Sequence, residues 1–389
     1  MKLLVVLSRV PYPLDKGDKL RAWYQLKELK KQHEIHLLCL DDTCKGIEQR
    51  EKLKEIADVV EICPLPKWSI ALRTLQAIFS KKPFQVCYFN SPSAKRKLRR
   101  LINSAKPDHI FVQMIRTSEL VKNEHQIAKT LDFMDALSKG AERRIKEEKG
   151  LKKLFWKIEW QRLIGYENLM FDYFDNKLII SEQDRDLIYH QERKKIHILP
   201  NGVDTSYYSP IKKNAEYELV FVGNLSYLPN IQAAQIIAKE ILPSLNATGI
   251  KTKLLISGAS PSSEIKILEG GQITVSGWIN DIRTAYSSGK IFVAPMQIGT
   301  GMQNKLLEAM SMGIPVITTP LAWKAIGGEH RRELLIANDT AEFVKGITEL
   351  LSDKNLYSQI SENARNYVFK NYSWEKEVNK LNRIICKTD

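Results

Sequence analysis

Residues 294–317 combine glycines with a lysine and a carboxylate in an order that suits a phosphate-bearing ligand. The segment reads as the end of a strand, a loop containing Gly299 and Gly301, a helix from about Met302 to Gly313, and a second strand. A helix that begins at the carboxyl end of a parallel strand presents unpaired N–H groups and the positive end of its dipole, and both favour phosphate. The segment therefore predicts a pyrophosphate site at the helix start.

Lys305 and Glu308 lie three residues apart and so share one face of that helix. The lysine could neutralise phosphate charge, and the carboxylate could accept hydrogen bonds from ribose hydroxyls. Together they suit a nucleoside diphosphate. The same spacing also occurs in incidental ion pairs on exposed helices, so the pattern alone leaves a structural interpretation open.

The elements that must position these residues follow from short apolar runs that alternate with helical patterns. This alternation predicts parallel sheets covered by helices on both faces, and it restarts near residue 217, after the turn-forming sequence 199–204. We therefore expect an α/β chain of two doubly wound, Rossmann-like domains that face a cleft, with ligands at the carboxyl ends of their strands. The expected strands are 3–7, 35–40, 109–113, 177–180, 197–199, 219–222, 253–256, 273–275, 291–294 and 315–318.

Composition indicates a folded protein without a membrane-spanning segment. Hydrophobic residues make up 43% of the 389 residues and charged residues 27%, and no apolar run approaches the ~20 residues that cross a bilayer. The start of the chain lacks the pattern of a secretory signal. The five cysteines form no C-x-x-C pair, which argues against a zinc site and a disulfide framework. We expect a cytoplasmic protein.

Positive charge is concentrated in the first half of the chain. Residues 1–200 contain 39 Lys and Arg against 27 Asp and Glu, while residues 201–389 contain 20 against 18. This asymmetry favours an anionic partner such as a membrane surface, a phosphorylated acceptor or nucleic acid, although a general contribution to solubility is the alternative. Residues 69–79 and the long helical stretch 136–174 could lie on a membrane, or could pack on their own domain as ordinary amphipathic helices.

With these residues in view, segment 294–317 resembles the signature of family 4 glycosyltransferases of the GT-B fold. Many members carry a Glu, seven residues, and a second Glu that is followed by Ala-Met and a later Gly-x-Pro-Val. The second half of this signature matches Glu308, Ala309, Met310, Gly313, Pro315 and Val316. The first acid falls at Thr300, which is a departure, whereas Gly301, Lys305 and Glu308 match the Gly-x-x-x-Lys-x-x-Glu arrangement of a subgroup.

Other segments resemble the same family in the same order along nearly the whole chain. Two of them are similar to a bacterial exopolysaccharide-associated branch: the loop 8–21 after the first strand, and the Asp-x-x-Asp-x-x-Ser element at 132–138. The remaining matches are the interdomain element 200–204, the opening of the donor domain at 221–225, the base-binding turn 275–281, and the start of the terminal helix at 372–374.

The resemblance implies a retaining glycosyltransferase that moves a sugar from a nucleoside-diphosphate sugar to a glycan or lipid-linked acceptor in bacterial cell-surface polysaccharide biosynthesis. We expect no cofactor besides the donor and no metal ion. Residues 1–199 would form the acceptor domain, to which the helix 370–389 crosses back, and residues 200–369 would bind the donor. The basic first domain suits a peripheral contact with an anionic membrane, at the inner face of the plasma membrane.

The implied site residues fall into three groups. Lys305 and Glu308 would bind the departing nucleotide, and Asp135 would position the acceptor or assist as a base, a helix N-cap being its alternative role. Arg9, Lys16, Lys19 and Arg116 could recognise an anionic acceptor, the alternative being that they are ordinary solvated loop residues. The donor would be bound by Gly17, Gly223, Asn224, Gly277, Trp278, Thr300, Gly301, Met302, Gln303, Asn304, Lys305 and Glu308.

Two other classes of function compete with sugar transfer. One is a nucleotide-sugar epimerase of the GT-B fold, and the other is a basic protein that binds membrane or nucleic acid without catalysis. The basic segment 94–101 has a helical period and no aromatic residues, so we expect no nucleic-acid partner. No G-x-G-x-x-G follows either opening strand, which argues against a dinucleotide-binding domain. Asp184 and Asp186 lie in a charged segment after Ser181 that resembles a helix start rather than a metal site.

Overall fold

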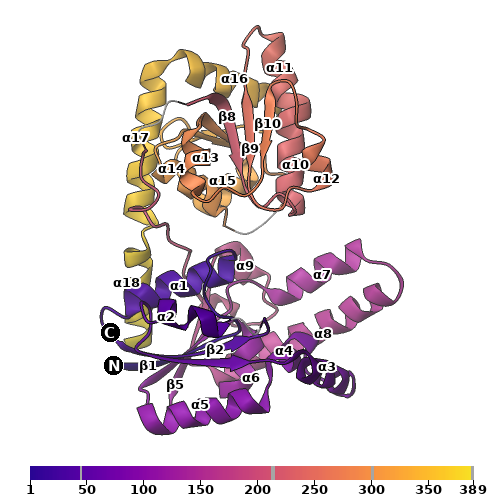
Figure 1. Cartoon of the computed structure of the whole chain (residues 1–389), viewed down its shortest axis with the longest axis vertical. Helices are drawn as coiled ribbons and strands as arrows, with labels where there is room; N and C mark the ends of the chain where they lie inside the picture. Colours follow the sequence, from indigo (N-terminus) through magenta and orange to yellow (C-terminus); the bar gives the residue numbers. More distant parts are fainter. Residues whose placement is uncertain (44–45, 212–214, 299–301, 387–389) are drawn as a thin grey trace. The chain divides into compact units, whose positions relative to one another are not determined.

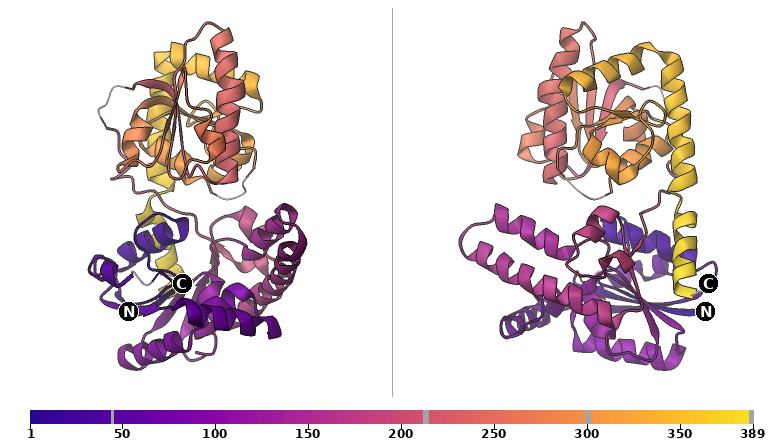
Figure 2. Two further views of the ribbon diagram at one scale, coloured as in Figure 1. Left: turned by 45° about the vertical axis from the view of Figure 1, so that its right-hand side comes forward. Right: turned by 180° about the vertical axis from the view of Figure 1, so that it is seen from behind.

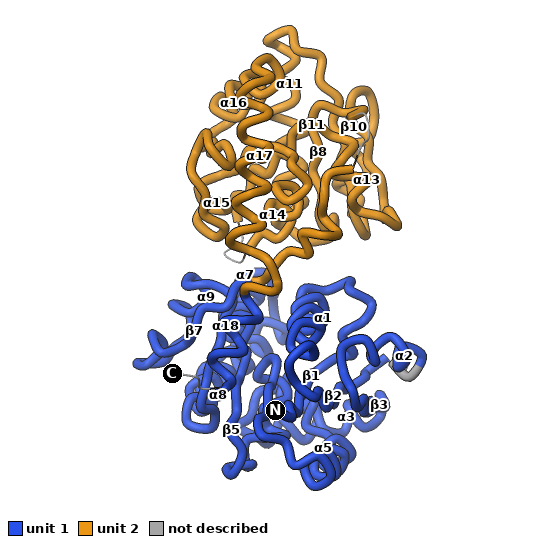
Figure 3. The backbone as a smooth tube through the Cα atoms, turned by 90° about the vertical axis from the view of Figure 1, so that its left-hand side faces the viewer, with its two compact units in different colours: residues 1–200, 377–389 blue, residues 201–376 orange. Residues whose placement is uncertain are grey.

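The computed structural model of the chain describes residues 1–43, 46–211, 215–298 and 302–386, which form two compact units (Figure 3). The first unit contains Met1–Pro200 and Glu377–Asp389, and the second contains Asn201–Lys376. The terminal helix α18 (Trp374–Cys386) therefore begins in the second unit and continues into the first. Within the first unit, Met1 lies beside the end of α18, since Cys386 Sγ is 3.5 Å from Met1 Sδ.

The first unit is a parallel sheet with helices on both faces (Figure 1). Its strands are β1 (Lys2–Leu7), β2 (Glu34–Asp41), β3 (Val59–Pro64), β4 (His109–Gln113), β5 (Ala128–Asp132), β6 (Asn176–Ile179) and β7 (His197–Ile198). Its α-helices are α1 (Gly17–Leu29), α2 (Arg50–Leu53), α3 (Lys67–Gln76), α4 (Phe84–Phe89), α5 (Pro92–Ala105), α6 (Ser118–Val121), α7 (Leu137–Glu147), α8 (Gly150–Tyr173) and α9 (Glu182–Asp186). The strand order is β3-β2-β1-β4-β5-β6-β7, so the direction of winding reverses between β1 and β4.

The second unit repeats this architecture. Its strands are β8 (Tyr217–Val222), β9 (Leu254–Ser257), β10 (Ile273–Ser276), β11 (Gly289–Ala294), β12 (Val316–Thr318) and β13 (Leu335–Ile336). Its α-helices are α10 (Leu228–Ile236), α11 (Leu242–Ala247), α12 (Ser263–Lys266), α13 (Ile282–Ser287), α14 (Asn304–Ser311), α15 (Pro320–Ile326), α16 (Thr340–Ser352) and α17 (Lys354–Asn371). The order β10-β9-β8-β11-β12-β13 reverses between β8 and β11. Both units are thus doubly wound and Rossmann-like.

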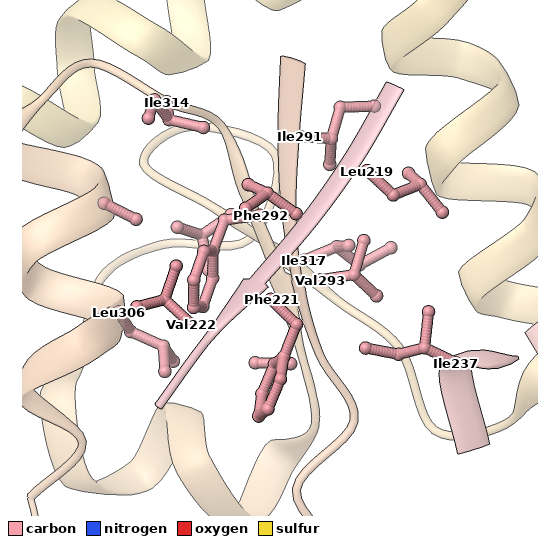
Figure 4. Close-up of a cluster of buried hydrophobic side chains, with 14 of the residues drawn as sticks. Leu219, Phe221, Val222, Ile237, Ile291, Phe292, Val293, Leu306, Ile314 and Ile317 are labelled. Carbon is pink, nitrogen blue, oxygen red and sulfur yellow. The ribbon is translucent and has the colours of Figure 1, made fainter. Parts of the chain in front are cut away.

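The central strands of the second unit are easy to predict from the sequence because they are buried on both faces. Leu219 and Phe221 of β8 and Ile291 and Phe292 of β11 are fully buried among side chains from both covering layers (Figure 4). A parallel strand covered on both faces needs a nearly continuous apolar run, because neither face meets water. These strands therefore stand out from the helical patterns around them.

Every strand expected from the sequence is present, and three more occur in the described residues. The extra strands β3, β5 and β13 were missed because Glu61 interrupts the first, Lys129 and Thr130 interrupt the second, and the third is only two residues long. The helical stretch expected over residues 136–174 is present, but it is not continuous. It is divided into α7 and α8, and Gly150, at the start of α8, has a left-handed φ of 57°.

No helix among the described residues is both long enough and apolar enough to cross a membrane.

A buried ion pair fixes α1 against the end of β5. The side chains of Arg21 and Asp132 are both fully buried, and Arg21 Nε donates to Asp132 Oδ2 at 2.7 Å. Gln25, one turn further along α1, donates to the same oxygen at 3.2 Å. A buried carboxylate without such donors would bear a large desolvation cost. This pair therefore positions both the loop before α1 and the loop after β5.

We predict that Arg21→Met lowers the free energy of unfolding by about 3–5 kcal/mol, because it leaves the Asp132 charge buried without its partner. Urea denaturation followed by circular dichroism measures the change. The matched control is Lys31→Met, which removes a pair with Glu28 whose lysine is largely exposed, and we expect an effect below about 1 kcal/mol. Equal effects of the two substitutions would contradict a structural role for the buried pair.

Candidate active site

The donor-side candidates gather where the strand order of the second unit reverses. Gly223 leaves the carboxyl end of β8, and the chain leaving the neighbouring strand β11 leads to α14. Open α/β sheets bind ligands at such reversal points. The helix begins at Asn304 rather than near Met302, with Gln303 as its N-cap residue, and Gly313 with φ of 71° follows its end. Thr300 and Gly301 lie outside the described residues.

Lys305 belongs to the first turn of α14. Its Nζ donates to Asn230 Oδ1 at 2.5 Å and lies 5.5 Å from the centroid of the Phe221 ring. Burial lowers the pKa of the Lys305 ammonium to about 8, and the negative charge of Glu308 opposes this shift. A partly desolvated cation at a helix start is a stronger partner for phosphate than a fully hydrated one, because fewer waters compete.

Asn230 links the exit of β8 to the start of α14. The side chain is buried, and its Nδ2 donates to the backbone carbonyl of Asn224 at 2.9 Å while its Oδ1 accepts from Lys305. A Cβ on Gly223 would lie only 2.8 Å from Asn230 Nδ2. A glycine at 223 therefore leaves the room that Asn230 needs, and the structure brings Gly223, Asn224 and Lys305 together.

Glu308 is oriented by two tyrosines. Its Oε2 accepts from Tyr286 Oη at 2.6 Å, and Tyr208 supplies a second hydrogen bond. Burial raises the pKa of the Glu308 carboxyl, and these hydrogen bonds and the charge of Lys305 lower it. A carboxylate offers about four acceptor positions, so it retains capacity for ligand hydroxyls. Lys305 and Glu308 thus contact different partners and do not form the incidental surface pair that their spacing allowed.

The remaining donor-side candidates surround this centre. Met302, Gln303 and Asn304 are half-buried at the start of α14, and Asn304 Oδ1 is buried without a hydrogen-bond partner among the described residues. Gly277 and Trp278 follow β10, and Trp278 is 70% exposed. Asp281 then caps α13 through the Arg283 backbone N–H. An exposed aromatic beside the strand ends is available for stacking.

A second set of candidates lies at the strand reversal of the first unit. Arg9 follows β1, Arg116 follows β4, and Asp135 follows β5. Arg9 NH1 donates to Asp18 Oδ2 at 2.7 Å, and Arg116 donates to Gln85 Oε1 at 2.8 and 3.1 Å. Burial lowers the pKa of the Arg116 guanidinium, and the nearby charge of Arg9 lowers it further. Two such cations favour an anion between or beside them.

The four basic candidate residues line two pockets of the first unit. Arg9 lines a pocket of about 270 Å³ with Lys16 and Lys19, and also a pocket of about 310 Å³ with Arg116. Lys19 pairs with Asp15 at 2.9 Å, and Lys16 is the exposed N-cap residue of α1. Gly17 begins that helix, and a Cβ added there would meet no other atom within 4 Å. The sequence therefore identified residues that share one edge of the first sheet.

Asp135 is not a helix N-cap, because Ala136 holds that position before α7. Desolvation by the surrounding protein raises the pKa of its carboxyl to about 6, and the charge of Asp184 adds to the shift. The residue is nevertheless exposed to solvent, which weakens the desolvation behind this shift. Asp184 itself belongs to the first turn of α9, where its backbone N–H donates to the N-cap residue Ser181, so the helix start expected there is present.

The residues that sequence reasoning missed are Asn230, Tyr286 and Tyr208. Asn230 is 75 positions from Lys305, and Tyr286 is 22 positions from Glu308. A polar residue inside α10 and a buried tyrosine in α13 carry no local signal, because only the folded sheet brings them to α14.

Comparisons with known proteins agree with this architecture. The family model described as "Glycosyl transferases group 1" matches residues 216–353. An uncharacterised 44.6 kDa protein in the cps region of Klebsiella pneumoniae is 25% identical over 407 residues, which covers 96% of this chain and 97% of that protein.

Solved structures resemble the whole chain. Sucrose-phosphate synthase from Thermosynechococcus elongatus has a TM-score of 0.68 at 12% identity, covering 100% of this chain and 99% of that one. HepE from Anabaena has a TM-score of 0.68 at 13% identity and covers 100% of both chains. These likenesses confirm the GT-B fold. Together with the group 1 domain, they identify the chain as a glycosyltransferase.

We predict that the Lys305 amine titrates near pH 8, whereas exposed lysines titrate near ~10.4. The measurement is ¹³C NMR of the reductively methylated protein, with Lys305→Arg to assign the signal. Glu308→Gln removes the carboxylate that favours the charged amine, so the Lys305 titration should move to still lower pH. A Lys305 signal that titrates together with the bulk of the lysines would show that the amine is not desolvated as described.

Proposed function

We propose that the chain is a retaining glycosyltransferase that moves a sugar from a nucleoside-diphosphate sugar to a glycan or lipid-linked acceptor in bacterial cell-surface polysaccharide biosynthesis. The observation that carries the proposal is the position of Lys305, in the first turn of α14 and beside the end of β8, where Asn230 anchors it. A desolvated cation and free helix N–H groups at a sheet reversal suit a diphosphate.

In this proposal the donor spans the strand ends of the second unit. The diphosphate binds the N–H groups at the start of α14 and the ammonium of Lys305, and the ribose hydroxyls donate to Glu308. Gly277 and Trp278 contact the base. The structures of Anabaena HepE in complex with UDP and with UDP-glucose support a nucleotide-sugar donor for this fold.

The chemistry needs stabilisation of the departing diphosphate as the anomeric C–O bond breaks. Helix N–H groups and Lys305 supply it electrostatically, and such preorganised electrostatic stabilisation usually contributes most to catalysis. The acceptor hydroxyl attacks from the face of the leaving group, so its oxygen forms the new bond with retention and its proton passes to a diphosphate oxygen. Asp135 accepts a hydrogen bond from the acceptor and positions it. No side-chain nucleophile and no metal ion take part.

The acceptor in this proposal is anionic and meets the first unit. Arg9, Lys16, Lys19 and Arg116 line its two pockets and would bind phosphate or carboxylate groups. The Klebsiella relative supports a polysaccharide context, since it is named as a protein in the cps region. A cytoplasmic location at the inner face of the plasma membrane fits this acceptor class.

Donor binding is tested by thermal shift against a panel of nucleotide sugars. Ligand at 100 times its Kd stabilises the folded state by about 2.7 kcal/mol, which corresponds to a rise of several degrees in the melting temperature. Lys305→Ala and Glu308→Ala should lose this response yet remain folded. The matched control is Lys290→Ala on β11, an exposed lysine paired with Glu218, which should keep it. An unchanged response in both site variants would place the donor elsewhere.

Catalysis is then followed as nucleoside diphosphate release from the best donor. Release that depends on added acceptor indicates transfer, whereas epimerisation would change the donor without any acceptor. Activity should persist in EDTA, because Lys305 and the N–H groups of the helix, rather than a metal ion, stabilise the charge of the departing diphosphate. Acceptor-independent conversion of the donor, or loss of activity in EDTA that magnesium restores, would contradict the proposal.

A further inference from the structure

Helix α3 of the first unit is oriented with its apolar side outward. Trp68, Leu72 and Leu75 follow helical spacing, and all three are exposed, Trp68 by 73%. Phe79, in the short turn after the helix, is 91% exposed. Arg73 of the helix points the other way: it is buried and donates to the Tyr88 carbonyl at 2.9 Å and to Ser69 Oγ at 2.6 Å.

The first half of α8 likewise exposes its apolar side chains and buries a charged one. Leu151 is 85% exposed, and Leu154, Phe155 and Ile158 are exposed on the same face. The carboxylate of Glu159 is instead fully buried, where it accepts from the backbone N–H groups of Phe84 and Gln85 at 2.7 and 3.1 Å. Amphipathic helices of a water-soluble surface normally bury the apolar stripe, so this arrangement indicates a non-aqueous neighbour.

The two apolar stripes belong to one surface. The rings of Phe84 and Phe155 lie 4.9 Å apart. Arg162 of α8 donates to the carbonyls of Ala77 and Ile78 at 2.8 and 3.2 Å, which holds the segment after α3 along α8. Figure 1 shows α3 and α8 next to each other, and Figure 2 shows from behind how α7 and α8 project together from the sheet. We name this surface the apolar face, made of Trp68, Leu72, Leu75, Ile78, Phe79, Leu151, Leu154, Phe155 and Ile158.

Positive charge surrounds the apolar face. No Asp or Glu occurs in residues 62–107 or in residues 149–158. The exposed lysines here make no ion pair in the part of the chain that the structure describes; they are Lys67, Lys81, Lys149, Lys152, Lys153 and Lys157. Unpaired ammonium groups beside apolar side chains are the composition that binds a headgroup region carrying negative charge.

We propose that the apolar face docks the first unit onto an anionic lipid bilayer. The apolar side chains enter the boundary between headgroups and acyl chains, and the lysines contact anionic headgroups. A second copy of the chain is a poorer occupant, because its own face would bring lysines against lysines. This inference does not depend on the chemistry of sugar transfer. If both proposals hold, sugar transfer takes place at the membrane surface.

Docking would also present the membrane to the acceptor pocket. Thr74 and Phe155 line the 310 Å³ pocket that contains Arg9 and Arg116, and Phe155 also belongs to the apolar face. An amphiphilic acceptor could therefore keep its lipid in the bilayer while its charged headgroup meets the two arginines. The pocket and the face are continuous through one aromatic side chain.

The test is flotation of the full chain with phosphatidylcholine vesicles and with vesicles that contain one-third phosphatidylglycerol. Wild type should bind the anionic vesicles and release from them as salt rises. Phe79→Ser combined with Leu151→Ser should weaken the partition at least about tenfold. Lys152→Glu combined with Lys153→Glu should do the same. The matched controls are Ile267→Ser, an 81% exposed apolar residue of the second unit, and Lys251→Glu combined with Lys253→Glu, and both should bind as wild type.

Four outcomes would overturn the proposal: no binding of wild type to anionic vesicles, equal binding to neutral ones, binding that the face variants leave unchanged, or a face-dependent dimer in light scattering without vesicle binding. The donor thermal shift, measured on the same variants, should be unchanged in all of them. If the chain binds vesicles but no nucleotide sugar raises its melting temperature, the proposed function is refuted and the docking inference stands. If a nucleotide sugar raises the melting temperature but the chain binds no vesicles, the docking inference is refuted and the proposed function stands.

Discussion

The contact that the proposed donor site depends on is the hydrogen bond from Lys305 to Asn230. It joins the first turn of α14 to α10, while the other end of the Asn230 amide holds the backbone that leaves β8. Gly223 makes the contact possible, because any side chain there would collide with the amide. A cation that would otherwise be mobile is thus fixed beside a helix start at the point where the sheet reverses.

Around that contact, burial rather than surface charge sets the electrostatics. Lys305 and Glu308 are each half-buried, and each is paired with neutral partners, an amide for the ammonium and tyrosine hydroxyls for the carboxylate. Neutral partners position a charge without neutralising it, so both charges remain available to a ligand. The core of the first unit differs, because there the charges of Arg21 and Asp132 neutralise each other. This pair holds α1 and β5 in position and is not available to a ligand.

Most of the fold could be predicted from the sequence, because buried parallel strands need apolar runs and turns need specific residues. Three strands were not predicted. In β3 and β5 the apolar run is broken by Glu61 and Lys129, whose polar ends reach partners that only the tertiary structure supplies, and β13 is only two residues long. The division of residues 136–174 was missed because charge density hid the break at Gly150.

The candidate site could be predicted from the sequence only where its residues are close together along the chain. Lys305 and Glu308 share a helix, and their types and spacing suffice to suggest a ligand. Asn230 and Tyr286 could not be found, since nothing in their neighbourhood differs from an ordinary helix. The apolar face was only partly visible, because periodicity shows that a helix is amphipathic but not which side faces out, and the burial of Arg73 and Glu159 settles that question.

The most direct measurement is a crystal structure of the chain with UDP bound. The account predicts diphosphate oxygens within about 3.2 Å of Lys305 Nζ and of backbone N–H groups at the start of α14, with a ribose hydroxyl donating to Glu308. A nucleotide bound in the second unit away from the β8–β11 reversal, with Lys305 still engaged only by Asn230, would contradict it.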